Sequence, residues 1–327
     1  MDVVSIGETM VLFTPREQGQ MRYSRSYTSR IAGAETNTLI GLAKLGHRTG
    51  WISQVGKDEF GAQIMAAVRG EGVDTSQTAV HPSAPTGVFY KERLQEASVR
   101  VYYYRQGSAT SLLVPESIDE NYIARAKYLY LTGITPALSP NCREAVFHAI
   151  GLARKHGVQV VFDPNLRRKL WSDEEAREVL TRLCGMADLV LAGISEGTFL
   201  FGDGDGNKDG DGKKSSGSYL AERFLQLGCK AAILKLGAEG AYYSTGIEQR
   251  RVPGFKVDHV ADPVGAGDGF AAGVLSGLLD GLPLEEAVRR GCAIGAAVVT
   301  VNGDIEGLPD RELLAAFMSG RGEDVAR

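Results

Sequence analysis

The sequence predicts an α/β fold in which helices flank a central, mainly parallel sheet, with a small additional β-sheet beside it. Strand-like and helix-like segments alternate along most of the 327 residues, as is typical of a parallel sheet covered by helices. Two stretches, 12–31 and 85–108, instead combine Tyr, Arg, Thr and Phe with a period of two residues. We therefore expect an α/β core from residues 1–11, 32–84 and 109–327, and a small sheet from the other two stretches.

The strands expected in the core are short apolar runs. In chain order they are Val3–Gly7, Trp51–Val55, Tyr128–Leu131, Val158–Asp163, Leu189–Ala192 and Ala231–Leu236. The expected helices carry apolar residues at helical spacing, and Ala34–Lys44 shows this most clearly because Gly46 follows it as a stop signal. The other expected helices are Phe60–Val68, Asn141–Lys155, Asp173–Cys184, Tyr219–Leu227, Asp268–Leu279 and Leu284–Val299.

The small sheet is best marked by Val99–Arg105, where the period of two residues is clearest. A small sheet built from two loops would cover the C-terminal edge of the main sheet, where ligands bind in open α/β folds. In that position it would act as a lid that excludes water from a bound ligand. A pair of ordinary edge hairpins is the alternative.

Composition and charge narrow the classes of partner. Hydrophobic residues make up 43% of the chain and charged residues 23%, which is ordinary for a soluble globular protein. The net charge of −4 disfavours a broad nucleic-acid surface, although local arginines can still hold a small anion. No apolar run reaches the length of a membrane span, so we expect neither nucleic acid nor membrane as a partner.

The N-terminus and the cysteines favour a cytoplasmic protein. Residues 1–7 include an acidic residue at the second position, Asp2, and are expected to form a strand, not a signal peptide. The cysteines are isolated from one another, which disfavours a disulfide framework or a zinc site and favours a reducing compartment. The histidines have no ligand spacing, and no role is assigned to them.

One segment, residues 202–212, is rich in Asp and Gly and is expected to be a surface loop. Its stretch Asp205–Gly210 matches the opening of an EF-hand loop, which leaves calcium binding as an alternative. Against calcium, Ser216 stands at the twelfth position, where an EF-hand has a bidentate Glu. The role of this loop stays open.

The segment Gly265–Asp268 has the features of a phosphoryl-transfer site. A Gly-rich turn opens directly into an apolar helix, so the first backbone N–H groups have no partner within the helix and form an anion site. A carboxylate at Asp268 would repel a phosphate unless it serves the reaction, for example by accepting a proton from an attacking hydroxyl. The alternative is that Asp268 is only the N-cap of the helix.

Four motifs together resemble the ribokinase-like (pfkB) family of carbohydrate kinases. Asp262–Asp268 is similar to the family's D-T-x-G-A-G-D, with Pro263 in place of Thr. Gly33–Asn37, Val55–Gly61 and Lys235–Gly240 are similar to three further family segments, in the family's order and approximate spacing along the whole chain. The resemblance implies a ribokinase-like fold and catalysis by Asp268 as the base, with Gly265, Ala266 and Gly267 as the anion hole.

The resemblance also implies ATP and Mg²⁺. Residues expected to contact the nucleotide are Asn165, Lys235, Gly237, Gly240 and Asn302. Glu196 keeps the Glu of the family's N-x-x-E and would bind Mg²⁺ through water, although Gly193 replaces the Asn. Asp262, with nearby carbonyl groups, would hold a monovalent cation such as K⁺, as in many family members.

Two arginines indicate the substrate class. Arg105 lies in the expected lid, and Arg167 follows a strand at the edge where the site should be, so the two side chains could converge. Guanidinium groups bind carboxylates in a bidentate manner, whereas a neutral sugar would leave two arginines unpaired, so we expect a sugar acid. The alternative for each arginine is a structural ion pair or a contact with ATP.

Within the family, the motifs Y-Y-R-x-G-S-A, D-x-N-x-R-x-x-L-W and G-A-E-x-N resemble the 2-keto-3-deoxygluconate kinases. Substrate contacts are therefore expected from Gly33, Ala34, Asn37, Phe89, Tyr104, Arg105 and Arg167, with Tyr90 left open beside Phe89. The implied reaction transfers the γ-phosphoryl group of ATP to the 6-hydroxyl of 2-dehydro-3-deoxy-D-gluconate. The resemblance also implies a homo-oligomer that pairs through the lid.

Several alternatives stay open. Another kinase of the family could act on fructose, ribose or 5-dehydro-2-deoxygluconate, and the gluconate and galactonate configurations of the substrate are not separated. A non-catalytic sugar-binding regulator is disfavoured because Asp268 is present. A Rossmann dehydrogenase is disfavoured because no G-x-G-x-x-G follows the first strand.

Overall fold

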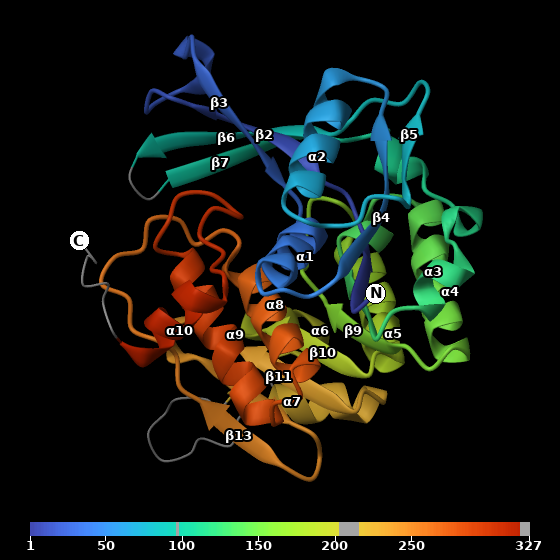
Figure 1. Cartoon of the computed structure of the whole chain (residues 1–327), viewed down its shortest axis with the longest axis vertical. Helices are drawn as coiled ribbons and strands as arrows, with labels where there is room; N and C mark the ends of the chain where they lie inside the picture. Colours follow the sequence, from blue (N-terminus) through green and yellow to red (C-terminus); the bar gives the residue numbers. More distant parts are fainter. Residues whose placement is uncertain (96–97, 203–215, 321–327) are drawn as a thin grey trace.

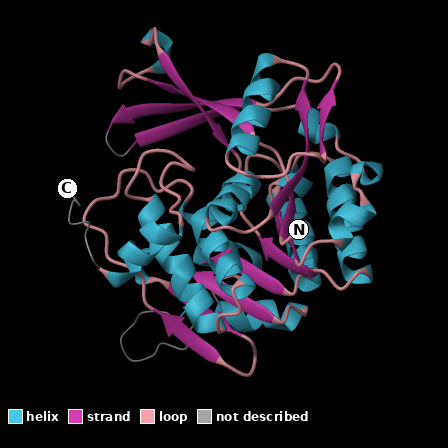
Figure 2. Cartoon of the chain, viewed as in Figure 1, coloured by secondary structure: helices cyan, strands magenta, loops and turns pink. Residues whose placement is uncertain are grey.

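The computed structural model describes residues 1–95, 98–202 and 216–320. The stretch Asp205–Gly210, with its EF-hand-like opening, lies outside the described residues. In the described part, helices enclose the strands of one large sheet, and a second, smaller sheet stands apart from them (Figure 2). No described helix combines the length and the apolar character needed to cross a bilayer.

The main sheet comprises nine strands among the described residues, in the order β13-β12-β11-β10-β9-β8-β1-β4-β5. Their bounds are β1 Val3–Ile6, β4 Thr49–Gly56, β5 Thr78–His81, β8 Tyr128–Thr132, β9 Gln159–Asp163, β10 Leu189–Gly193, β11 Ala231–Lys235, β12 Ala241–Ser244 and β13 Gln249–Val252. All neighbouring pairs are parallel except β11 with β12 and β12 with β13. The expected central, mainly parallel sheet is therefore confirmed.

Helices cover both faces of this sheet. Their bounds are α1 Ala34–Lys44, α2 Glu59–Gly70, α3 Glu120–Ala124, α4 Pro140–Lys155, α5 Asp173–Met186, α6 Ile194–Phe201, α7 Ser216–Leu227, α8 Ala266–Leu279, α9 Leu284–Val298 and α10 Arg311–Ser319. Residues of α1, α2, α8, α9 and α10 share one buried cluster, and residues of α3 to α7 share the other.

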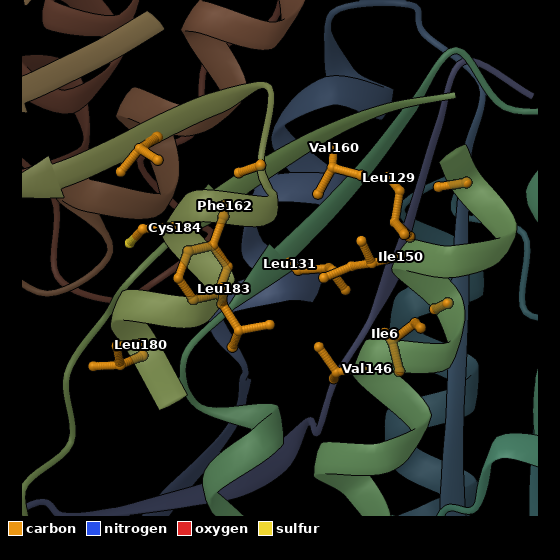
Figure 3. Packing of buried hydrophobic residues seen from close by; sticks show 14 of the residues in the cluster. Ile6, Leu129, Leu131, Val146, Ile150, Val160, Phe162, Leu180, Leu183 and Cys184 are labelled. Carbon is orange, nitrogen blue, oxygen red and sulfur yellow. The ribbon is translucent and has the colours of Figure 1, made fainter. Parts of the chain in front are cut away.

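Alternation along each strand divides the core between the two faces. In β9, Val160 and Phe162 enter the cluster beneath α4 and α5, while Val161 points to the opposite cluster. Figure 3 shows Phe162 beside Leu183 and Cys184 of α5, with Val146 and Ile150 of α4 nearby. Buried apolar contacts on both faces explain why the parallel strands are almost continuously hydrophobic.

The second sheet has four strands in the described part of the chain, in the order β3-β2-β6-β7. They are β2 Met10–Pro15, β3 Tyr27–Ala32, β6 Val88–Gln95 and β7 Ser98–Tyr104. Because β2 pairs with β6 in parallel, the two stretches form a single sheet and are not separate edge hairpins. Figure 1 shows this sheet standing on one side of the molecule, above the loops that lead into α8. The expected additional sheet is confirmed, whereas its action as a lid and the division into domains stay predictions.

Candidate active site

A cavity of about 490 Å³ lies between the small sheet and the C-terminal ends of the main-sheet strands. Its wall brings together residues from the small sheet, from the start of α1, from the strand ends and from the turn before α8. The chemically relevant ones are Glu8, Gly33, Ala34, Asn37, Phe89, Lys91, Tyr103, Arg105, Asn165, Arg167, Glu196, Lys235, Gly265, Gly267, Asp268 and Asp304. Most of the residues expected from the sequence therefore face one space.

The turn before α8 has a backbone shape that requires glycine. Gly265 has a φ of +83°, and a Cβ added there would lie 2.8 Å from the carbonyl oxygen of Asp304. The first backbone hydrogen bond into the helix runs from the N–H of Gly269 to the carbonyl of Gly265, at 2.8 Å. The N–H groups of the residues between them therefore lack helical partners and can receive an anion.

Asp268 is buried in the first turn of α8. The side-chain amide of Asn37 donates to its Oδ2 at 2.8 Å, and the hydroxyl of Thr38 donates to its carbonyl at 3.2 Å. Burial raises the pKa of Asp268 to about 7; the Asn37 bond opposes the rise, and the charge of Asp304 adds to it. The N-cap alternative is wrong, because Gly265 occupies that position and the Asp268 carboxylate bonds to Asn37 instead.

If Asp268 is the base that the sequence predicts, its raised pKa sets the pH dependence of the reaction. Only ionised Asp268 can accept a proton, and its pKa is about 7. We therefore expect kcat/KM to rise about tenfold per pH unit below that value and to level off above it. Initial rates measured across about pH 5 to 9 would check this. The rising limb should disappear in Asp268→Asn; a flat profile for the unaltered protein would contradict the assignment.

Lys235, at the end of β11, supplies a cation beside the turn. Its Nζ lies 2.7 Å from Oδ2 of Asp163, at the end of β9, and a Cβ on Gly267 would lie 3.8 Å from the same Nζ. Burial raises the pKa of Asp163 to about 6, and the Lys235 charge opposes that rise. Asn165, with a φ of 35°, donates its N–H to Oδ1 of Asp163 at 3.1 Å. Lys235 is therefore held where a phosphate at the α8 terminus would meet it.

Glu196 faces the same cavity from the first turn of α6. Its Oε2 accepts from the N–H of Gly193 at 2.6 Å, and its Oε1 accepts from the N–H of Leu166 at 3.1 Å. No cluster of three acidic, His or Cys side chains that could hold a metal occurs among the described residues. A single fixed carboxylate fits Mg²⁺ that arrives with nucleotide phosphates and keeps several waters.

A second cavity, of about 440 Å³, adjoins the first, and Lys235, Pro263 and Gly267 line both. Its wall is mainly apolar and includes Phe255, Val257, Val260, Phe270 and Val299. Gly237 and Gly240, two of the residues expected to contact nucleotide, also line it. An apolar slot that leads to a helix N-terminus can hold a flat base on one side and its phosphates on the other.

The small sheet turns alternate side chains toward the first cavity. Val101, Tyr103 and Arg105 line it, and the ring of Phe89 stacks on that of Tyr103 with 5.4 Å between centroids. Tyr104 belongs to the opposite face, is 61% exposed and does not line the cavity. Sequence reasoning placed the aromatic contact one residue away from the tyrosine that the strand turns inward.

Both predicted arginines line the cavity, but their electrostatic situations differ. Arg105 forms a buried ion pair with Glu8, whose other carboxylate oxygen accepts from the hydroxyl of Ser108. The structural ion pair considered as an alternative for Arg105 is therefore present. Arg167 is exposed, and its guanidinium makes no hydrogen bond or ion pair within the part of the chain that the structure describes. Arg167 is consequently the cation best placed to receive an anionic ligand.

Some residues fall outside the expected arrangement. Asn302 is exposed, its carbonyl accepts from Arg30 at 2.8 Å, and it lines neither cavity. Three charged residues of the wall were missed: Glu8, Lys91 and Asp304. Glu8 follows a predicted strand at its C-terminal end, a position that could have identified it. Lys91 and Asp304 carried no comparable signal in the sequence.

Comparison with known proteins places the chain among sugar kinases. Residues 1–311 match the family model described as pfkB family carbohydrate kinase. The chain is 41% identical to a 2-dehydro-3-deoxygluconokinase of Bacillus subtilis, covering 98% of this chain and 96% of that protein. It is 34% identical to the 2-dehydro-3-deoxygluconokinase of Thermoproteus tenax, covering 97% of this chain and 95% of that protein. A 5-dehydro-2-deoxygluconokinase of Bacillus licheniformis is 33% identical, covering 96% of both chains.

Solved structures agree with the fold. A PfkB protein from Polaromonas sp. JS666 is 40% identical with a TM-score of 0.84, covering 97% of this chain and 99% of that chain. An Escherichia coli protein provisionally named ribokinase II, in complex with ATP and Mg²⁺, is 25% identical with a TM-score of 0.86. The match covers 98% of this chain and 99% of that chain. A fructokinase double mutant from Vibrio cholerae O395, with fructose, ADP and potassium ion bound, is 26% identical with a TM-score of 0.82. The match covers 97% of this chain and 98% of that chain.

Proposed function

Because the chain belongs to the pfkB family of carbohydrate kinases, we propose that it transfers the γ-phosphoryl group of ATP to the 6-hydroxyl of 2-dehydro-3-deoxy-D-gluconate. One observation carries the choice of a sugar acid. The buried carboxylate of Asp268 lines the same cavity as the guanidinium of Arg167, which has no hydrogen bond or ion pair among the described residues, so a base and an anion receptor would serve one substrate. Two relatives that carry the name of this activity support the same choice.

In the proposed reaction, Asp268 accepts the proton of the 6-hydroxyl while that oxygen attacks the γ-phosphorus and the bond to ADP breaks. Asn37 holds the carboxylate at 2.8 Å, so its orientation is fixed before the substrate arrives. The backbone at Gly265, Ala266 and Gly267 receives the charge that develops on the transferred group. Lys235 adds a cation at the same place.

Carboxylate recognition falls mainly to Arg167. Arg105 is already neutralised by Glu8, so its guanidinium shapes the cavity wall and offers only its remaining N–H groups to a ligand. Arg167 has no such partner in the described chain, and a bidentate contact with a carboxylate would satisfy it. Gly33 and Ala34 let the substrate approach α1 closely, and Phe89 and Tyr103 give the sugar chain an aromatic wall.

For the nucleotide, we propose that the base lies in the apolar cavity beside Gly237 and Gly240 and that the phosphates extend toward Lys235. Asn165 lies in the wall of the first cavity beside Lys235, where it can reach the phosphates. Mg²⁺ would be held through water by Glu196, and its chemistry would be to neutralise the charge of the transferring phosphates.

A substrate panel tests this proposal. Rates of ADP release would be compared for 2-dehydro-3-deoxy-D-gluconate, its galactonate-configured isomer, 5-dehydro-2-deoxygluconate, fructose and ribose. We expect the highest kcat/KM for one of the first two acids and far lower values for the neutral sugars. If fructose or ribose were phosphorylated best, the sugar-acid assignment would be wrong. If 5-dehydro-2-deoxygluconate were best, the alternative supported by the Bacillus licheniformis relative would replace it.

We also propose that the chain forms a homo-oligomer through the outer face of the small sheet. Aromatic rings gather on that face: Tyr90 stacks on Phe13 at 5.2 Å and meets Tyr27 and Tyr104 edge-on at 5.9 Å and 5.8 Å. Tyr104 remains 61% exposed at the surface. Such a surface is typical of a protein contact, and the mass of the protein in solution is the measurement that decides it.

The proposed location is the cytoplasm. Cys142, Cys184, Cys229 and Cys292 are all free thiols and all buried. Unpaired cysteines of this kind are typical of a reducing compartment, and detecting the protein in a cytosolic rather than a periplasmic or secreted fraction would support the assignment.

A further inference from the structure

Lys91 and Asp262 form a buried ion pair between the small sheet and the turn before α8. Nζ of Lys91, on β6, lies 2.5 Å from Oδ2 of Asp262, and the two residues are only 6% and 5% exposed. The other oxygen of Asp262, Oδ1, accepts the N–H of Val264 at 3.2 Å, next to Gly265. One carboxylate thus joins a lysine of the small sheet to the backbone of the anion-binding turn.

Asp262 is also the residue at which the family resemblance places a monovalent cation, and the fructokinase relative was solved with a potassium ion. The residues of this chain do not fit such an ion well. Asp262 already holds the ammonium group of Lys91 at contact distance, with little access to solvent. A second cation against the same carboxylate would be repelled by the first, and burial would prevent water from screening the two charges.

We infer that the ammonium group of Lys91 is a built-in replacement for the monovalent cation, so that phosphoryl transfer by this chain does not depend on K⁺. The ammonium group of lysine and K⁺ carry the same charge, and both interact with oxygen atoms: K⁺ is coordinated by them, and the ammonium group donates up to three hydrogen bonds to them. Supplied by β6, that charge is present whenever the small sheet is packed against the turn, whatever the salt around the protein. The inference rests on the proposed kinase function.

Lys91 is a positioning residue in this scheme. Its charge neutralises Asp262, whose Oδ1 then fixes the N–H of Val264 and with it the turn that carries Gly265. Burial raises the pKa of neighbouring Asp304 to about 6, and the charge of Lys91 opposes that rise. Because a Cβ on Gly265 would meet the carbonyl of Asp304 at 2.8 Å, both acidic residues border the anion-binding turn.

A competing role must be separated from this one, because Lys91 also lines the first cavity. If Lys91 bound the substrate or the transferred phosphoryl group directly, its removal would also lower activity. Only the positioning role, however, predicts that a free cation can take its place beside Asp262. Rescue by added cations is therefore the discriminating measurement.

The first experiment uses the unaltered protein. Its kcat and KM would be measured with Na⁺, K⁺ or NH₄⁺ salts at one ionic strength, with 2-dehydro-3-deoxy-D-gluconate and ATP as substrates. We expect the same kcat with each cation, within error. A strong and specific activation of the unaltered protein by K⁺ would overturn the inference.

The second experiment uses Lys91→Ala, with Lys230→Ala as a control that removes an exposed lysine just before β11, where it pairs with Asp188 just before β10. Lys91→Ala should lower kcat about 10²-fold in Na⁺, since a misplaced turn misaligns the reacting groups. K⁺ or NH₄⁺ should restore most of that loss, because either ion can enter the space that the ammonium group of Lys91 fills beside Asp262 in the unaltered protein. Lys230→Ala should show neither effect. A folded Lys91→Ala with no rescue would overturn the inference in favour of direct contact.

A double variant without either buried charge keeps the inference testable if Lys91→Ala does not fold. Lys91→Met with Asp262→Asn removes both buried charges, and K⁺ should not stimulate it; stimulation would contradict Asp262 as the cation's partner. Melting temperatures provide a readout that needs no sugar acid. K⁺ should raise the melting temperature of Lys91→Ala more than Na⁺ does, and should not do so for the unaltered protein. If no substrate in the panel were phosphorylated, these melting data would still decide the role of Lys91.

Discussion

Asp268→Asn is expected to lower kcat by about 10²–10⁴-fold, the usual contribution of a general base. Asn has nearly the same shape as Asp and can still meet the side chain of Asn37, which donates to Oδ2 at 2.8 Å in the unaltered protein. It cannot take a proton from the attacking hydroxyl. Burial raises the pKa of Asp268, which means that the ionised carboxylate is less stable in the folded protein than in water. The neutral variant should therefore fold at least as well.

Measurement of Asp268→Asn should separate chemistry from binding. ATP affinity, followed by calorimetry, should change little, while single-turnover rates fall by the full factor. Asp173→Asn is a suitable control, since that carboxylate is exposed at the start of α5 and pairs with Arg168. Turnover that persisted in Asp268→Asn would remove Asp268 from the catalytic role and would leave the anion-binding turn as a binding site only.

Much of the main sheet could be predicted because its elements carry their pattern locally. Ala34–Lys44 has the same bounds in the sequence prediction and in α1, since apolar spacing marks its face and Gly46 marks its end. Strands β12 and β13 were not predicted. Each is four residues long, and each exists because it pairs with a neighbour, so the decisive interaction is not contained in its own sequence.

The residues of the candidate site likewise fall into two groups, those that local sequence predicts and those that depend on contacts between distant segments. The turn at Gly265 could be predicted because its glycine, its following helix and its carboxylate are contiguous, and the structure gives Gly265 the positive φ that such a turn needs. Tyr103 could not be separated from Tyr104, because the phase of the alternation depends on which face of the small sheet is turned inward. The pairs Arg105 with Glu8 and Lys91 with Asp262 join residues far apart in the chain, and only the folded backbone brings them together.

These long-range pairs change the electrostatic argument for the substrate. From the sequence, two arginines were expected to be available to a carboxylate. In the structure Arg105 is paired with Glu8, whereas the guanidinium of Arg167 has no hydrogen bond or ion pair within the described residues. The net charge of the wall near Arg105 is therefore close to neutral. A sugar acid remains favoured, but the preference now depends on one side chain, and that side chain can be removed without disturbing a buried pair.

Arg167→Ala is accordingly expected to raise KM for 2-dehydro-3-deoxy-D-gluconate by about 10- to 100-fold, since hydrogen bonds to charged groups typically contribute about 1.5–3 kcal/mol. For a neutral sugar that the enzyme accepts slowly, KM should change little, because that ligand has no carboxylate to lose. The exposed guanidinium has no partner within the described chain, so the variant should keep its stability.

Arg168→Ala is the matched control for Arg167→Ala, because it removes the neighbouring arginine, which already pairs with Asp173. Its KM for the acid should stay close to that of the unaltered protein. The charge of Arg167 also lowers the pKa of Asp268, so Arg167→Ala should move the rising limb of the pH profile toward higher pH. An equal rise in KM for acidic and neutral sugars would show that Arg167 shapes the cavity and does not bind the carboxylate of the substrate. Equal effects in Arg167→Ala and Arg168→Ala would point instead to the general positive potential of this segment.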